Sequence, residues 1–223
     1  MRWLVVLVFL LLGAASAQLE VRFLDVGQGD AVLIRAPTGE TVLYDGGRRD
    51  EQVLEYLRDL GVTRVDLVIA SHPDLDHIGG LEAVVRAYEP RFYLDNGLDY
   101  GSVAYNELEA ALAELQTTQL PPSARRIDLG DAVAQVLPPP SLPALGNNDN
   151  SVGLEVSYGD FKLALTGDAE AAQFTWWAEN IPELLGDVDV YKASHHGSEN
   201  GDTPLSMSRF KPGAVVVSAG QPL

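Results

Sequence analysis

The stretch "SHPDLDHIGG", residues 71–80, places two histidines and two aspartates within six positions and closes with two glycines. It follows "RVDLVIAS" (64–71), whose continuous apolar run predicts a buried strand. It opens a helical pattern that ends before Pro90. A helix cap needs only one short polar residue. The four side chains together therefore predict a metal site at a strand end, with these candidate ligands: His72, Asp74, Asp76 and His77.

The other ligand-type residues also follow predicted strands. His195 and His196 come directly after "VDVYKAS" (188–194), and these two with His72 and His77 are all four histidines of the chain. Asp168 ends "FKLALTGD", and Asp45 ends "TVLYD". Because strand ends are rigid, they can hold several ligands at a common point.

The spacing favours two metal ions rather than one. Alternate residues of an extended segment point the same way, so His72 and Asp74 can face one ion. Asp76 and His77 can face a second ion, and Asp168 can bridge both. Either His195 or His196 can complete the second ion. As structural alternatives, Asp168 can cap a helix and Asp45 can form a tight turn, but these explanations leave the histidines unexplained.

The remaining patterns predict two mixed sheets with helices on the outside. The order is strands, helices, strands, helix, strands, and half of the chain reads as hairpins. The first three strands read as an antiparallel meander with Gly- and Pro-rich turns. The expected strands are 19–25, 31–36, 41–45, 64–71, 91–95, 188–194 and 214–220, with hairpins at 125–139 and 151–168; the expected helices are 50–61, 77–89, 103–115 and 169–180.

Composition limits the chemistry. The 223 residues, 46% of them hydrophobic, suit one domain with a full core. The chain has no cysteine, so histidine and carboxylate are the available metal ligands. The formal net charge of −17 repels nucleic acid at long range, so we expect no stable nucleic-acid binding. A phosphodiester substrate would have to be attracted by metal ions or a local basic patch.

The N-terminal segment "MRWLVVLVFLLLGAASAQ" has the pattern of a signal peptide covering residues 1–17, with cleavage after Ala17. Its apolar run is shorter than the roughly 20 residues of a membrane span, although an uncleaved anchor is the alternative. We therefore expect a secreted or periplasmic domain at 18–223, with no membrane span in the mature form. Its oligomeric state is not addressed by the sequence.

Beyond this reading, "SHPDLDHIGG" resembles the HxHxDH signature of metallo-β-lactamase-fold hydrolases, with Asp74 at the second histidine. Together with "FLDVGQGDAVLI", "NDNSVGLEV", "LTGD" and "ASHHGS", it resembles the hydrolase domain of DNA-uptake competence channel proteins and their secreted single-domain relatives. The resemblance implies a four-layer αββα sandwich with a dinuclear site. It implies as metal ligands His72, Asp74, Asp76, His77, Asp168 and His195.

The same resemblance gives roles to neighbouring residues. Asp45 would orient the histidine of the first ion from behind. His196 would be an outer residue or a substrate contact, and we predict Asp76 and His196 as catalytic residues. The expected cofactors are two divalent ions, Mn²⁺ or Zn²⁺, and Asp74 shifts the preference towards Mn²⁺.

Two departures from the family pattern bear on activity. Many relatives carry a further ligand histidine before the second half of the site, whereas this chain has none between residues 78 and 194. The first ion is therefore expected to be held by fewer ligands. Competence-type domains continue past "VVVSAG" into an Asn…Tyr-Gly-His-Pro segment, so we expect a chain that is C-terminally truncated or lacks that element.

The function expected is that of a secreted metal-dependent hydrolase. It would be a phosphodiesterase or nuclease acting on DNA, single-stranded DNA included, or on a related phosphodiester, through a metal-bridged hydroxide. The alternatives are a hydrolase of lactone or β-lactam substrates and a non-catalytic module with a degraded site. The candidate substrate contacts are Arg48, Lys192, Ser198 and Asn150. For Arg48, the competing explanation is a solvated surface position. We read Trp176 and Trp177 as core residues.

Overall fold

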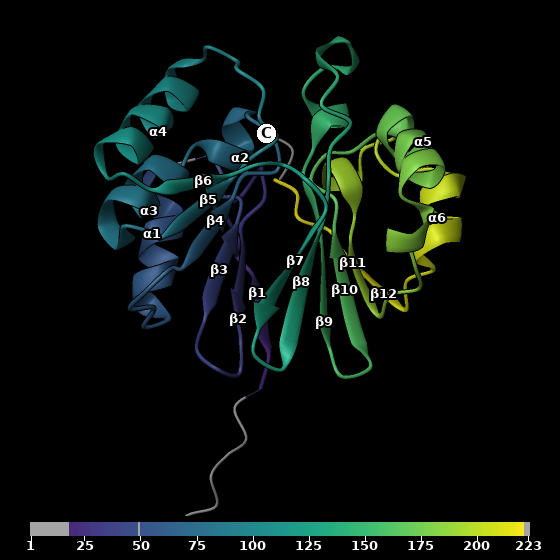
Figure 1. Cartoon of the computed structure of the whole chain (residues 1–223), viewed down its shortest axis with the longest axis horizontal. Coiled ribbons are helices and arrows are strands. Elements are labelled where there is room, and N and C mark those ends of the chain that lie inside the picture. Colours follow the sequence, from purple (N-terminus) through teal and green to yellow (C-terminus); the bar gives the residue numbers. More distant parts are fainter. Residues whose placement is uncertain (1–17, 49, 221–223) are drawn as a thin grey trace, which may run out of the picture.

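The computed structural model describes residues 18–48 and 50–220. The predicted signal peptide, residues 1–17, lies outside the described residues. Two six-stranded sheets pack face to face, and helices cover the outer face of each sheet (Figure 1). The predicted four-layer αββα sandwich of two mixed sheets is confirmed.

The first sheet has the order β1-β2-β3-β4-β5-β6. Strands β1 to β3 pair antiparallel, as the predicted meander requires, and β3 to β6 pair parallel. The short strand β6 was not predicted, because its sequence "TQL" carries too weak a pattern. The bounds are β1 Glu20–Phe23, β2 Val32–Arg35, β3 Thr41–Tyr44, β4 Leu67–Ile69, β5 Phe92–Leu94 and β6 Thr118–Leu120.

The second sheet has the order β12-β11-β10-β9-β8-β7. Strands β7 to β10 form antiparallel hairpins, and β10, β11 and β12 are parallel. Both predicted hairpins are present. The bounds are β7 Arg125–Leu129, β8 Ala132–Leu137, β9 Gly153–Tyr158, β10 Phe161–Leu165, β11 Val190–Lys192 and β12 Ala214–Val216.

Helices lie on both outer faces. Helices α1, α3 and α4 cover the first sheet, and α5 and α6 cover the second (Figure 1). The sequence pattern missed α6, which Thr203 caps by accepting a hydrogen bond from the backbone of Ser206. The helices are α1 Asp50–Asp59, α2 Leu75–Ile78, α3 Leu81–Tyr88, α4 Val103–Glu114, α5 Ala171–Asn180 and α6 Pro204–Phe210; 3₁₀ turns span Pro143–Leu145, Asn148–Asn150, Pro182–Leu184 and Ser194–Gly197.

Strand alternation divides the core into three layers. In β4, Leu67 and Ile69 face the opposite sheet while Val68 faces the helices, as period-2 geometry requires. A third cluster lies under α5 and includes Trp177, which is fully buried and donates from Nε1 to the carbonyl of Pro138 at 2.7 Å. The core assignment of Trp177 is thus confirmed. No described helix is long and apolar enough to cross a membrane.

The sandwich brings the carboxyl ends of four parallel-paired strands to one edge. Strands β3 and β4 of the first sheet end beside β10 and β11 of the second. Gly167, with φ +55°, has no room for a side chain, since a Cβ there would lie 2.7 Å from the Cβ of Ser71. This close approach joins the loop after β10 to the loop after β4.

Candidate metal centre

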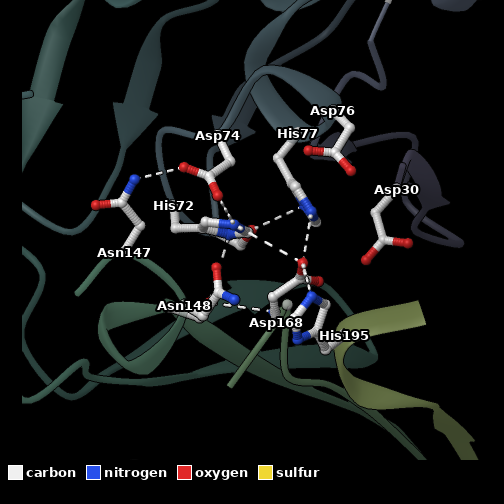
Figure 2. A network of polar contacts seen from close by, with 12 residues as sticks. Asp30, His72, Asp74, Asp76, His77, Asn147, Asn148, Asp168 and His195 are labelled. Atoms are coloured by element: carbon white, nitrogen blue, oxygen red, sulfur yellow. Dashed lines mark hydrogen bonds and ion pairs between the residues drawn. The ribbon is translucent and has the colours of Figure 1, made fainter. Parts of the chain in front are cut away.

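Asp168 lies at the centre of a group of converging polar side chains at this edge (Figure 2). Its Oδ2 lies 3.2 Å from His77 Nε2, 3.3 Å from His196 Nε2 and 3.9 Å from His72 Nε2. Sets of three side chains could each hold an ion, namely His72–His77–Asp168, Asp76–His77–His196 and Asp30–Asp168–His196. We call these six residues the His/Asp cluster: Asp30, His72, Asp76, His77, Asp168 and His196.

The three cluster histidines present the same ring nitrogen to the centre. His77 Nδ1 donates to Asp45 at 2.9 Å, and His196 Nδ1 donates to the carbonyl of Ser218 at 2.8 Å. Ser71 Oγ donates to Asp45 at 2.8 Å, which leaves its oxygen to accept from His72 Nδ1 at 3.0 Å. Each ring is therefore oriented with Nε2 towards the centre, and a ring that gives up its Nε2 proton is in the neutral form that binds a metal.

Buried atoms in the cluster have no hydrogen-bond partner among the described residues. They are the Nε2 atoms of His72, His77 and His196, Oδ1 of Asp168 and Oδ1 of Asp30. Buried polar atoms without a partner destabilise a fold by roughly 1–3 kcal/mol each. Nitrogen and carboxylate oxygen are ligands for Zn²⁺ and Mn²⁺, so the residues present fit divalent ions.

The carboxylates also control protonation. Burial by itself would lower the pKa of His77, but the Asp168 and Asp45 carboxylates outweigh it and raise the pKa to about 10. Burial likewise opposes the charge on His196, yet Asp168, Asp30 and Asp76 raise its pKa to about 11. These values belong to the protein without metal, where protons balance the carboxylates. A divalent ion would replace those protons on binding.

The same charges act on the aspartates. Burial opposes ionisation of Asp168, but His77 and His196 hold its pKa well below the ordinary range. The neighbouring His196 ring, whose Nε2 lies 3.5 Å from Asp76 Oδ2, is the largest cause of the lowered pKa of Asp76. Both side chains are therefore ionised and available as ligands.

Backbone strain is concentrated at the same edge. Asp45 has φ 60°, His195 has φ 48° and His196 has φ 56°, all in the left-handed region. Such conformations cost about 1–3 kcal/mol each for residues other than glycine and persist where the surroundings fix them. The fold thus holds these side chains in place against a local preference.

Two predicted ligands lie at the outside of the cluster. Asp74 Oδ2 is 3.7 Å from His72 Nε2, while its Oδ1 accepts from the amide of Asn147 (Figure 2). His195 Nε2 is 3.9 Å from Asp168 Oδ2, and its Nδ1 is 3.0 Å from Glu170 Oε1. His196 is nearer to Asp168 than His195 is, so the distances favour His196 as the ligand after β11. The assignment of His195 stays a prediction.

Asp45, which is predicted to orient a histidine of the first ion, lies beside two of the cluster histidines. It pairs with His77, and it connects to His72 only through Ser71, whose backbone N–H donates to Asp45 Oδ1 at 2.6 Å. The reason is geometric: Asp45 ends β3, and the neighbouring strand β4 continues into Ser71. One buried carboxylate therefore orients two histidines, one directly and one through a hydroxyl.

Two predicted substrate contacts have partners inside the protein. Lys192 is 1% exposed and forms an ion pair with Asp30, which carries the loop after β1 onto β11. Asn150 is fully buried, donates to the carbonyls of Leu142 and Gly146 and accepts from the backbone of Leu142. Both side chains use their polar atoms inside the protein, and their role in substrate binding stays a prediction.

The other two predicted contacts, Arg48 and Ser198, are exposed. Within residues 18–48 and 50–220, no side-chain hydrogen bond or ion pair joins either one to the cluster. Their role in substrate binding stays a prediction.

Asp30 is the cluster member that sequence reasoning missed. It lies in "VGQGD", where glycine and aspartate are read as turn residues. Its carboxylate is 1% exposed, with Oδ1 3.5 Å from His196 Nδ1 and Oδ2 paired with Lys192. The sequence did hold a signal for this ion pair. The segments "GQGD" and "VYKASHH" each place a charged residue, Asp30 and Lys192, beside an apolar strand.

Comparisons with known proteins agree with this geometry. Recombination protein 2 of Haemophilus influenzae is 29% identical over 210 residues, covering 91% of this chain and 24% of that protein. ComE operon protein 3 of Bacillus subtilis is 26% identical over 226 residues, covering 92% of this chain and 29% of that protein. The chain thus spans about a quarter of the length of these relatives.

A solved structure of human tRNase Z, short form, has a TM-score of 0.55 and 15% identity, covering 90% of this chain and 93% of that one; it shows a shared fold. The sequence profile of the Metallo-beta-lactamase superfamily matches residues 24–218. Together with the two-sheet sandwich and the histidines and aspartates at its edge, this match assigns the family. The chain belongs to the metallo-beta-lactamase superfamily.

Proposed function

We propose that the protein is a metal-dependent phosphodiesterase that cleaves nucleic acid, with single-stranded DNA as the candidate substrate. One observation supports metal-dependent hydrolysis above the others. Three Nε2 atoms and two carboxylate oxygens, all buried and all without hydrogen-bond partners, converge at one edge of the sandwich.

The proposed ligands divide into an inner and an outer group. The inner group is His72, His77, Asp76, Asp168 and His196. We call Asp74 and His195 the outer pair, and we propose that they complete the coordination of the two ions. Two bound divalent ions would supply an activated water and neutralise the charge that develops on a phosphoryl group.

Phosphodiester chemistry is supported by the excess of carboxylates and by the named relatives. Asp30, Asp74, Asp76 and Asp168 surround the site, and hard oxygen ligands suit the ions that act on phosphates. The relatives are named Recombination protein 2 and ComE operon protein 3, although the match covers only 24% and 29% of their lengths. With a net charge of −17, the protein would contact a nucleic acid mainly at the ions.

We propose Mn²⁺ or Zn²⁺ as the native ion and export with cleavage after Ala17. Metal analysis of protein purified from its natural compartment tests the first point. N-terminal sequencing of the mature protein tests the second, since cleavage as proposed leaves Gln18 as the first residue.

The activity is tested on purified protein loaded with Mn²⁺ or Zn²⁺. Hydrolysis of single-stranded DNA and of bis-p-nitrophenyl phosphate is measured with and without a chelator, alongside the variant Asp76→Ala. Chelator-sensitive turnover that the variant loses supports the proposal. Absence of metal-dependent turnover of any phosphodiester would contradict it.

The competing activity is hydrolysis of a lactone or β-lactam, which the superfamily name itself suggests. The same preparation is therefore assayed with nitrocefin and an acyl-homoserine lactone. Turnover of either compound without turnover of phosphodiesters would reverse the order of the two functions.

A further inference from the structure

A cavity of about 340 Å³ lies directly beside the outer edge of the His/Asp cluster. Its walls come from three separate places in the fold: residues 73–75 at the start of α2, residues 100–104 at the start of α4, and Asn147 in the long loop after β8. The volume falls in the lower part of the roughly 300–1,000 Å³ range of small-ligand sites.

The walls are apolar where they face solvent. Leu75 is 48% exposed and Val103 is 74% exposed, and both are among the large hydrophobic side chains that the described fold leaves open to water. Exposed apolar side chains gathered around a hollow mark a binding surface more often than single ones do. Tyr100 adds an aromatic ring to the same walls.

The Tyr100 ring is held in position from behind. Its hydroxyl oxygen accepts from the amide of Asn96 at 3.4 Å, and its ring meets that of Tyr105 edge to face at 6.3 Å between centroids. A ring fixed in this way offers a flat surface without losing much conformational freedom on binding.

The negative charge of Asp74 in the cavity wall disfavours the binding of an anionic group in this cavity. Among the described residues that line the cavity, Asp74 alone is charged and none is a lysine or an arginine. Asp74 also lies 3.7 Å from His72 Nε2, so the cavity opens beside the proposed ions. A phosphate would therefore be bound at the ions, while the cavity would take an uncharged group attached to it.

We infer that this cavity is a subsite for a nucleobase adjacent to the scissile phosphate, a conclusion that rests on the proposed phosphodiesterase function. A base has a flat apolar face that stacks on an aromatic ring and a polar edge that seeks hydrogen bonds. The amide of Asn147 donates to Asp74, which turns its carbonyl oxygen away from that carboxylate (Figure 2). That oxygen can accept from the exocyclic amine of a base.

The test compares two short single-stranded oligonucleotides, one intact and one in which the base beside the cleaved bond is replaced by an abasic tetrahydrofuran. With Mn²⁺-loaded enzyme, kcat and KM are measured for wild type, Tyr100→Ala, Tyr100→Phe and Val103→Asp. We expect Tyr100→Ala and Val103→Asp to raise KM for the intact strand about 5- to 150-fold, the range for loss of one base–aromatic stack. Tyr100→Phe keeps the ring but loses the hydrogen bond from Asn96, and it should raise KM much less than Tyr100→Ala does.

The abasic strand provides the readout that a merely structural effect would not produce. For the wild-type enzyme, KM should be higher for the abasic strand by the same factor. The variants should show no further increase in KM on that strand. Val215→Asp is the matched control, because Val215 is 51% exposed on β12 and does not line the cavity. Circular dichroism and metal content verify that each variant is folded and loaded.

The possible failures are distinguishable. Equal KM values for intact and abasic strands with wild-type enzyme would overturn the subsite and leave the phosphodiesterase proposal standing. Hydrolysis of neither strand would overturn both. Turnover of acyl-homoserine lactones that improves with acyl-chain length and is lost in Val103→Asp would assign the cavity to an acyl chain instead.

Discussion

The inner ligands and the outer pair are held by the fold in different ways. His72, His77 and His196 are buried, and each has its Nδ1 fixed by a hydroxyl, a carboxylate or a carbonyl. In the outer pair, the side chain of Asp74 is 41% exposed and that of His195 is 22% exposed. Each of the two also contacts a polar neighbour that can draw it away, Asn147 for Asp74 and Glu170 for His195.

This difference indicates that the site is organised from the inside. Strand ends and buried partners orient the proposed inner ligands, whereas the outer pair would have to leave other partners to complete the proposed coordination. Preorganised ligands contribute most to affinity because little ordering remains to be done on binding. The predictions below test this division, beginning with the largest expected effect.

Asp168→Asn should have the largest effect. The carboxylate lies within 3.9 Å of three cluster histidines, and its loss would remove the ligand proposed to be shared by the two ions. We expect a fall in kcat beyond the roughly 100-fold that loss of an outer partner causes, together with loss of bound metal. A variant that keeps most of its activity would mean that the cluster is not the reaction centre.

Lys192→Met should have the next largest effect, a fall in the free energy of unfolding. It leaves the Asp30 carboxylate buried without its cation, which costs about 3–5 kcal/mol in comparable cases. Urea denaturation of the metal-free protein measures the loss. The control Lys162→Met removes an exposed pair with Glu155 on the neighbouring strand, where about 1 kcal/mol or less is expected. Equal losses of unfolding free energy in the two variants would contradict a larger stabilising role for the buried Asp30–Lys192 pair.

Asp45→Asn should weaken metal binding about 10- to 100-fold with little change in fold, because Asp45 orients His77 and, through Ser71, His72. Isothermal titration with Mn²⁺ measures the affinity. Asp66→Asn is a matched control, since Asp66 accepts from the backbone of Thr41 at the opposite end of β3. If both variants bound the ion as wild type does, Asp45 would have no orienting role.

Asp74→Ala and His195→Ala should have the smallest effects, about 10-fold or less in metal affinity, the lower end of the range for outer partners. The same titration, run beside His77→Ala, places them on one scale. An effect of either outer variant as large as that of His77→Ala would erase the division between inner and outer ligands.

Much of this arrangement was predictable from the sequence because strand ends determine it. Apolar runs that end in His72, Asp168 and His195 specify a sheet edge with ligands, and the two-sheet fold follows from the order of elements. Single elements with weak patterns were missed. The strand β6 is short and polar, and α6 depends on a cap rather than on an apolar face.

Side-chain partners distant in sequence were not predictable. Lys192 looks like a surface cation until the fold places Asp30 beside it, 162 residues away along the chain. Asn150 looks like a free polar group until the loop folds around its amide. Residue type indicated that these groups are polar, but only the tertiary contacts determine which of them are already satisfied.

Metal stoichiometry tests the central claim most directly. Purified wild-type protein is loaded with Mn²⁺ or Zn²⁺, freed of excess ion and analysed for metal per chain. Two ions per chain, falling below one in Asp168→Asn, is the predicted result. Fewer than one bound ion in the wild type would contradict a dinuclear centre and would favour a binding module that has kept the fold without the chemistry.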